Sequence, residues 1–178
     1  QDSIKNGFAL LTEERRATGI FGILNIRENT VISSLKRHKK GFYLSEKSMK
    51  EDTQKYIDAL RTKTPSQETK IRALSGGNQQ KVSIAKWLSA DCDIIVIDEP
   101  TVGVDIGAKE YIHDLIWNLA KNEQKAVVLI SSDMNEVISL SRRMLIFKEK
   151  EIVAELKGEE FFQQPGEVIS AKIGEYFI

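Results

Sequence analysis

The sequence predicts an α/β fold in which a mainly parallel sheet is covered by helices. Residues 94–97 and 126–130 are short, continuous aliphatic runs, the pattern of strands that are buried on both faces. These runs alternate with longer segments whose apolar residues recur at helical spacing. Residues 29–88 contain no such run, so we expect a helical insertion in the front part of the chain.

The N-terminal half contains one predicted strand and two predicted helices. Residues 8–11 form a short apolar run typical of a buried strand, and residues 12–22 are polar, basic and interrupted by glycines, like an exposed loop. Residues 48–62 have an apolar face at helical spacing and end before Pro65, so they predict an amphipathic helix. Residues 76–88 predict a second helix with a buried stripe.

The C-terminal half continues the alternation. The predicted elements are, in order, a strand at 93–98, a helix around 112–119, a strand at 126–131, a short helix around 134–138, strands at 144–147 and 152–156 joined by a tight turn, and a last helix around 169–176. Such an order favours a parallel sheet with crossover helices.

The composition excludes several classes of protein. The chain has 178 residues, with 26 Lys plus Arg against 26 Asp plus Glu, so no bulk charge attracts it to nucleic acid or to an anionic bilayer. Its single cysteine, Cys92, cannot form an internal disulfide, which favours a reducing compartment. No apolar run reaches the ~20 residues that a membrane-spanning helix needs. The N-terminus has neither an initiator Met nor signal-peptide features, so we expect the chain to begin within a longer protein.

One motif lies at the start of the second predicted helix. Residues 74–81, Leu-Ser-Gly-Gly-Asn-Gln-Gln-Lys, place a serine and two glycines there. The first turn of a helix has unpaired N–H groups and the positive end of the helix dipole, which together hold a phosphate. Taken alone, Ser75, Gly76 and Gly77 favour an ordinary serine N-cap. The full octet favours the phosphate-binding interpretation.

A second motif is an apolar strand that ends in two carboxylates, Asp98 and Glu99. Ligands of open α/β sheets bind at the carboxyl ends of strands. One carboxylate can hold Mg²⁺ while the next polarises a water for attack on a γ-phosphate. Taken alone, Asp-Glu-Pro is also typical of a solvated acidic turn.

The order and spacing of these motifs carry a resemblance. About two dozen residues separate Ser75 from the carboxylates, and residues 101–105, Thr-Val-Gly-Val-Asp, follow directly. The three segments resemble the signature motif, Walker B strand and D-loop of an ATP-binding cassette (ABC) ATPase. The octet is similar to that of the second, C-terminal cassette of bacterial monosaccharide importers. Residues 12–16, Thr-Glu-Glu-Arg-Arg, resemble the Q-loop region of those cassettes, and residues 131–133 fall at the switch region.

The resemblance covers essentially the whole chain and implies its organisation. Residues 1–28 would be the Q-loop region of the ATPase core, residues 29–90 the helical subdomain with the signature, and residues 91–178 the α/β core with Walker B, D-loop and switch. The fold would then be a partial ABC-ATPase core that lacks the P-loop portion. The implied cofactors are ATP and Mg²⁺. The implied site residues are Ser75, Gly76, Gly77, Gln79 and Asp105 for nucleotide binding, Glu99 and Ser132 for catalysis, and Asp98 and Glu13 for the metal.

Three departures from the family pattern matter. No glycine of the chain is followed by Lys or Arg, so the phosphate-binding P-loop is absent, and this fragment alone is expected to be inactive. Ser132 stands where active cassettes carry a histidine, which predicts slow or no hydrolysis at the site built on this half. Val102 replaces the usual D-loop arginine, which removes a charge that would contact the other cassette.

The resemblance also implies partners and a location. Cassettes work as head-to-tail pairs, so Ser75, Gly76 and Gly77 would complete an ATP site on the N-terminal cassette of the same subunit. Residues 13–16 would face a membrane permease and couple hydrolysis to monosaccharide uptake, with an extracytoplasmic sugar-binding protein as an indirect partner. The protein would be peripheral, at the cytoplasmic face of the bacterial membrane. Residues 12–16 favour the galactose and methyl-galactoside branch over the ribose branch. A sheet without all of its strands exposes apolar surface, which predicts self-association of the fragment.

Two alternatives stay open. A non-hydrolytic, regulatory half of the cassette pair is favoured by Ser132 and the missing P-loop, whereas the intact Asp98-Glu99 pair argues against it. The cassette head of a DNA-repair ATPase also has a Leu-Ser-Gly-Gly signature, but it predicts a long coiled coil and a basic surface, and the sequence has neither. The basic run at 36–40 could meet nucleic acid or lipid head groups, but such a run is most often a solvated loop, and no nucleic-acid partner is expected.

Overall fold

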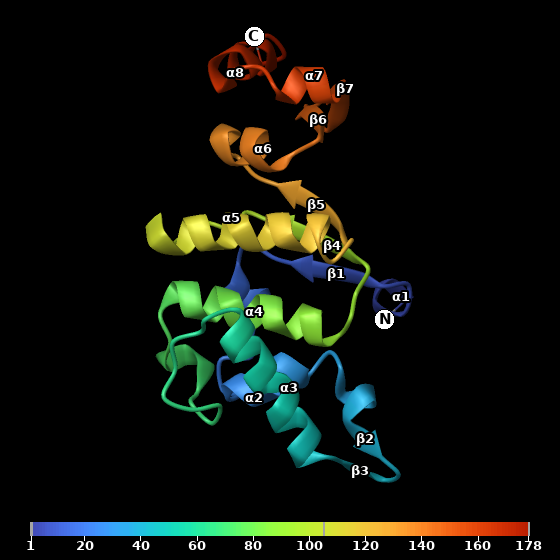
Figure 1. Cartoon of the computed structure of the whole chain (residues 1–178), viewed down its shortest axis with the longest axis vertical. Coiled ribbons are helices and arrows are strands. Elements are labelled where there is room, and N and C mark those ends of the chain that lie inside the picture. The colour runs from blue at the N-terminus through green and yellow to red at the C-terminus, as the bar shows by residue number, and fades with distance from the viewer. Residues whose placement is uncertain (1, 105, 178) are drawn as a thin grey trace. The chain divides into compact units, whose positions relative to one another are not determined.

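The computed structural model describes residues 2–104 and 106–177 and divides the chain into two units, residues 1–128 and 129–178 (Figure 1). The first unit is built on a sheet with the strand order β1-β4-β5. β1 (Phe8–Leu11) pairs in parallel with β4 (Ile94–Asp98), and β5 (Ala126–Ile130) is the neighbour of β4. The three strands coincide closely with the predicted ones, and the predicted α/β class is confirmed.

Helices cover one face of β1 and β4. Apolar side chains of α4 (Gly76–Ser89) and α5 (Ile106–Lys121) meet Leu11, Ile95 and Ile97 there. The opposite face is more open, with Phe8 and Leu10 about half exposed. The prediction that the strands are buried on both faces is therefore wrong for β1, because burial alternates along it. It is also wrong for β5, where Val128 and Ile130 are each 49% exposed.

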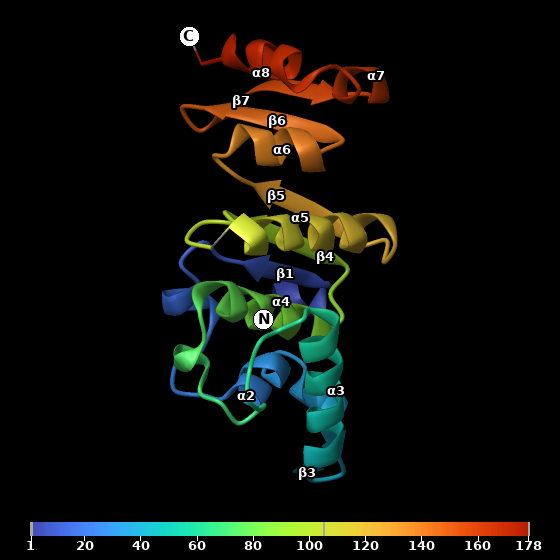
Figure 2. The same ribbon diagram turned by 60° about the vertical axis from the view of Figure 1, so that its left-hand side comes forward.

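The region between β1 and β4 is mainly helical, as predicted, and holds one small hairpin that the sequence pattern did not reveal. Its elements are the π-helical turn η1 (Arg15–Gly19), α2 (Ile26–Val31), the 3₁₀ turn η2 (Leu35–His38), β2 (Lys39–Lys40), β3 (Tyr43–Leu44), α3 (Glu46–Ala59) and the 3₁₀ turn η3 (Ile71–Ala73). Helix α2 packs against α3 and α4 (Figure 2). A boundary between residues 28 and 29 would cut α2, which is one continuous helix.

The start of the chain forms one short helix, α1 (Asp2–Lys5), directly before β1. Gly7 joins the two with a positive φ of 76°, a conformation that glycine adopts without strain. The amides of Asp93 and Ile94 donate to the Gly7 carbonyl at 2.9 and 3.0 Å. These bonds align the beginnings of β1 and β4.

The second unit has its own small core. It contains α6 (Met134–Leu140), an antiparallel hairpin of β6 (Arg143–Lys148) and β7 (Glu151–Lys157), α7 (Glu159–Phe162) and α8 (Gly166–Gly174). The hairpin turn, Glu149-Lys150, has positive φ values of 53° and 71°, typical of a type I′ turn. The predicted tight turn is confirmed. No helix in the described part of either unit is long and apolar enough to cross a membrane.

Candidate functional site

The parallel register brings two predicted acidic segments to one edge of the sheet. Leu11 pairs with Ile97, so Glu13 and the Asp98-Glu99 pair follow neighbouring strands at their carboxyl ends. Glu13 is exposed, and both residues of the pair are partly exposed. Glu99 has a φ of 46°, a left-handed conformation that costs a non-glycine residue about 1–3 kcal/mol. Backbone strain of this kind gathers at functional sites.

The signature segment begins α4 with its polar groups accessible. Ser75 is the N-cap residue and is exposed, Gly76 is partly exposed, and Gly77 is buried. The Ser75 hydroxyl makes no cap bond to the helix backbone; it accepts a hydrogen bond from Asn78 Nδ2 at 3.0 Å instead. The simple serine N-cap is therefore not what the structure contains. Because the first-turn N–H groups have no intrahelical acceptors, this end of α4 suits an anionic ligand.

Gln79, predicted to bind nucleotide, faces the protein interior. Its side chain is 2% exposed, and its amide nitrogen donates to the carbonyls of Leu74 and Ile71 at 3.0 and 3.3 Å. Its amide oxygen accepts from Arg16 Nε at 3.3 Å. Gln79 thus holds the turn before α4 in place, and its amide is not presented to a ligand at the surface.

Arg15 joins the signature segment to the loop after β4. Its two terminal nitrogens donate to the carbonyls of Val102 and Gly103 at 3.0 and 3.3 Å. A Cβ atom added to Gly76 would lie 2.8 Å from Arg15 Nη2 and 3.0 Å from the Gly103 carbonyl oxygen. The close approach of Arg15 and Gly103 therefore favours glycine at position 76, because a side chain there would have to displace one or both groups. Desolvation, and then the neighbouring Arg16, lower the pKa of Arg15, although a guanidinium stays charged in proteins.

A buried lysine fixes the other end of the same loop. Lys86 on α4 is 6% exposed and donates from Nζ to the carbonyl of Gly19 at 2.6 Å. Its ammonium also lies 4.7 Å from the centre of the Trp87 ring. Burial lowers the pKa of Lys86. The loop from Thr12 to Gly19 is thus attached to α4 near the signature, through Gln79, and two turns further along, through Lys86.

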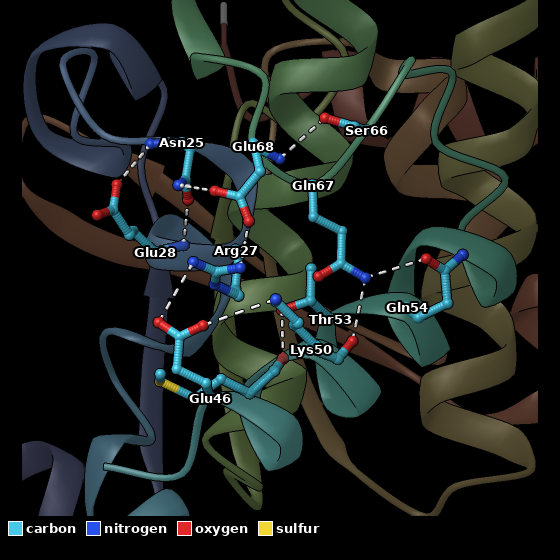
Figure 3. Close-up of polar contacts among 11 residues, drawn as sticks. Asn25, Arg27, Glu28, Glu46, Lys50, Thr53, Gln54, Ser66, Gln67 and Glu68 are labelled. Atoms are coloured by element: carbon cyan, nitrogen blue, oxygen red, sulfur yellow. Dashed lines mark hydrogen bonds and ion pairs between the residues drawn. The ribbon is translucent and has the colours of Figure 1, made fainter. Parts of the chain in front are cut away.

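The chain ahead of the signature is anchored by a polar network (Figure 3). Arg27 lies between the carboxylates of Glu46 and Glu68, 3.8 Å from the first and in direct contact with the second. Asn25 caps α2 in a reciprocal capping box with Glu28 and donates to Glu68 at 2.9 Å. These bonds connect α2, α3 and residues 66–69.

Backbone bonds extend this network to the signature. The Ile26 amide donates to Thr69 and the Ile71 amide donates to Leu24, each at 3.1 Å. Beyond the first turn of α4, Lys81 donates to the Arg61 carbonyl at 3.1 Å and lies 4.2 Å from the Tyr111 ring centre. The last residue of the octet therefore ties α4 to the end of α3 and to α5.

Not every predicted site residue is brought together. Asp105 lies outside the described residues. Ser132, two residues after the end of β5, belongs to the second unit. Within the described residues no group of three or more His, Cys, Asp or Glu side chains could hold a metal ion. Mg²⁺ usually takes one or two carboxylates together with phosphate oxygens, so Asp98 fits a metal that arrives with a nucleotide.

Sequence reasoning missed two contributors. The sequence places Arg15 only in a loop that is expected to face a permease, and none of its motifs includes Lys86. The position of Lys86 does predict a buried contact. It lies four residues after Val82 on the buried stripe of the helix, where a charged group requires a polar partner. Nothing local to Arg15 indicates the carbonyls that it binds.

Comparisons with known proteins agree with this geometry. A family model described as "ABC transporter" matches residues 2–102. The chain is 45% identical over 173 residues to the galactose/methyl galactoside import ATP-binding protein MglA of Fusobacterium nucleatum subsp. nucleatum, covering 97% of this chain and 34% of that protein. It is 49% identical over 146 residues to MglA 2 of Photobacterium profundum, covering 82% of this chain and 29% of that protein. The chain thus spans about a third of the length of these relatives.

Solved structures show the same fold. The ADP conformation of MJ1267, an ATP-binding cassette of an ABC transporter, matches with a TM-score of 0.75 at 22% identity, over 99% of this chain and 70% of that one. The dimeric bacterial ABC transporter cassette MJ0796 matches with a TM-score of 0.70 at 26% identity, over 85% of this chain and 62% of that one. Because the family model matches more than half of the residues of this chain, the chain belongs to the ABC transporter family.

Proposed function

We propose that this chain is the C-terminal part of the ATP-hydrolysing subunit of a monosaccharide importer, and that it donates its signature motif to a composite ATP site. One observation carries the proposal: Ser75 and Gly76 lie accessible at the start of α4, next to the loop after β4, with Arg15 between them. A nucleotide bound by the N-terminal cassette of the same subunit would meet these groups when the two cassettes close.

The proposed chemistry uses few residues of this chain. ATP supplies the phosphoryl group and Mg²⁺ neutralises its charge. The Ser75 hydroxyl and the first N–H groups of α4 donate hydrogen bonds to the γ-phosphate, which adds electrostatic stabilisation only on closure. In this chain's own half, Asp98 would hold the metal and Glu99 would orient a water, with Ser132 at the switch position and Asp105 in the D-loop. Glu13, exposed at the same sheet edge, is a further candidate oxygen ligand.

Transport would be coupled through residues 13–16. Arg15 and Arg16 connect this loop to the D-loop carbonyls and to Gln79 below the signature, so a displacement of the loop by the permease would be transmitted to both motifs. The permease and an extracytoplasmic sugar-binding protein are the proposed partners, and the cytoplasmic membrane face is the proposed location. The names of the relatives support galactose or methyl galactoside as the sugar.

A second candidate is a non-hydrolytic regulatory half. Ser132, in place of the histidine of active cassettes, favours it. In that case the chain completes its partner cassette's site while the site on its own half binds nucleotide without turnover.

The two candidates are separated by ATP hydrolysis in the full-length subunit assembled with its permease in proteoliposomes. Ser75→Arg should abolish turnover, because the longer, charged side chain fills the phosphate position. Ser3→Arg, the same change at another exposed serine, is the matched control. Glu99→Gln should leave most turnover if this half is regulatory and remove a large share if it is hydrolytic.

Two results would refute parts of the proposal. Turnover by Ser75→Arg equal to that of the Ser3→Arg control would exclude signature donation. Absence of uptake of both labelled galactose and labelled methyl galactoside, with uptake of ribose instead, would exclude the proposed sugar.

A further inference from the structure

The hairpin of β2 and β3 has a surface that the ATPase role does not use. Lys39 pairs with Leu44, and Lys40 pairs with Tyr43, around the turn Gly41-Phe42. Gly41 has a φ of 61°, the value that a type II′ turn requires at its first central position. Because Lys40 and Tyr43 are the last paired residues, Gly41 and Phe42 form the turn at the tip of this hairpin, whose strands are labelled in Figure 1.

Apolar and basic side chains together form this tip. Phe42 is completely exposed, at 106%, and Tyr43 and Leu44 are 67% and 42% exposed. Lys36, Lys39 and Lys40 are exposed around them. No Asp or Glu occurs between Glu28 and Glu46, so this segment is strongly basic although the whole chain has a net charge of zero. Such a concentration of exposed aromatic residues is unusual for a surface that faces only water.

The base of the hairpin is held rigidly. His38 is 5% exposed, with Nδ1 3.0 Å from the Ser48 hydroxyl and Nε2 3.4 Å from Asp52. Arg37 donates to the Ser89 carbonyl at 2.6 Å, and the Ser45 amide donates to the His38 carbonyl at 2.8 Å. Because these bonds connect the hairpin to α3 and α4, the exposed tip is presented in a fixed direction from the helical region.

We infer that this basic-aromatic tip binds the surface of an anionic phospholipid bilayer. Phe42 and Tyr43 would enter the interfacial region, where amphipathic aromatic rings are favoured, while the three lysines reach the phosphate groups. The choice of residues favours lipid over protein as the partner, because protein interfaces are depleted in lysine and use arginine instead. The tip is also convex, and a fluid interface can accept a protruding ring without a preformed pocket. The inference stands on the hairpin alone and does not depend on the proposed transport function.

Co-sedimentation of the 178-residue chain with lipid vesicles tests the inference. The chain should bind vesicles that mix phosphatidylglycerol with phosphatidylcholine, bind phosphatidylcholine vesicles weakly, and dissociate as salt is raised. The double variant Lys39→Gln/Lys40→Gln should lower the partition coefficient about 20- to 30-fold, the loss of two lysine–surface interactions. Phe42→Ser should lower it about tenfold or more through the loss of the buried ring.

Two controls isolate the hairpin. Lys47→Gln/Lys50→Gln removes two exposed lysines from α3, and Leu10→Ser changes the half-exposed face of β1, which could also attract lipid. Both should leave binding unchanged. Absence of binding to the anionic vesicles, equal binding to both vesicle types, or equal losses in the hairpin variants and the controls would each overturn the inference. So would hairpin variants that weaken binding to a purified permease or to nucleic acid but leave vesicle binding intact.

Discussion

The contact of Arg15 with Gly76 predicts a coupling between two positions that are 61 residues apart in the sequence. In Arg15→Ala, two hydrogen bonds from a charged donor to the carbonyls of Val102 and Gly103 are lost. Arg15 is partly exposed, so each bond contributes about 0.5–1 kcal/mol after screening by solvent. We expect the free energy of unfolding of the first unit to fall by about 1–2 kcal/mol.

The second perturbation is Gly76→Ala. The new methyl group would meet Arg15 Nη2 at 2.8 Å and the Gly103 carbonyl at 3.0 Å, and displacing them costs about 1–3 kcal/mol. Alanine also stabilises a helix by up to about 1 kcal/mol relative to glycine, which offsets part of this cost. In the Arg15→Ala background the shorter of the two contacts no longer exists, so the same change should cost about 1 kcal/mol less. The double variant is therefore expected to be more stable than the sum of the single effects predicts.

Urea unfolding followed by tryptophan fluorescence measures this coupling, because Trp87 and Trp117 both lie in the first unit. Gly22→Ala is the matched control, since an added Cβ there has no neighbour within 4 Å. Its effect should be the same with and without Arg15. Additive effects of Arg15→Ala and Gly76→Ala, within about 0.5 kcal/mol, would refute the proposed close approach.

Three further predictions concern groups around this site. Burial lowers the pKa of Lys86, so the folded state binds this proton less tightly than the unfolded chain does. The free energy of unfolding should therefore rise with pH between the lowered pKa and about 10.4, the pKa of an unperturbed lysine. Urea unfolding measures this rise, which should be absent in Lys86→Met. Asn25→Ala should lower the free energy of unfolding by about 1–2 kcal/mol, because the capping box is lost, and Glu28→Gln should lower it by less. Thermal unfolding measures both effects, and equal midpoints for Asn25→Ala and wild type would contradict this prediction. Burial, and then the charge of Asp52, raise the pKa of Tyr56 to about 12, so an absorbance titration should show a late phenolate step that Tyr56→Phe removes. Because unfolded tyrosine ionises near pH 10, the stabilisation from Tyr56 should be lost between about pH 10 and 12.

Most elements could be predicted because their signals are local. The helix expected at 76–88 is α4, and the strands expected at 144–147 and 152–156 are β6 and β7. The hairpin of β2 and β3 could not be recognised, since strands of two residues have no measurable alternation. Helix α2 could have been recognised from the Asn-x-x-Glu pattern at Asn25 and Glu28, which is a capping-box pattern.

For the candidate site, the sequence by itself determined the chemistry and its local placement. Ser75 and Gly76 begin a helix, and Asp98 and Glu99 end a strand, because caps, glycines and apolar runs act over a few residues. Only the tertiary structure decided that Gln79 faces the interior, that Arg15 binds the loop after β4, and that Lys86 binds Gly19. Arg15 binds a residue that is 87 positions away in the sequence, and Lys86 binds one that is 67 positions away. Such pairings depend on how the packed elements approach one another, which no local propensity encodes.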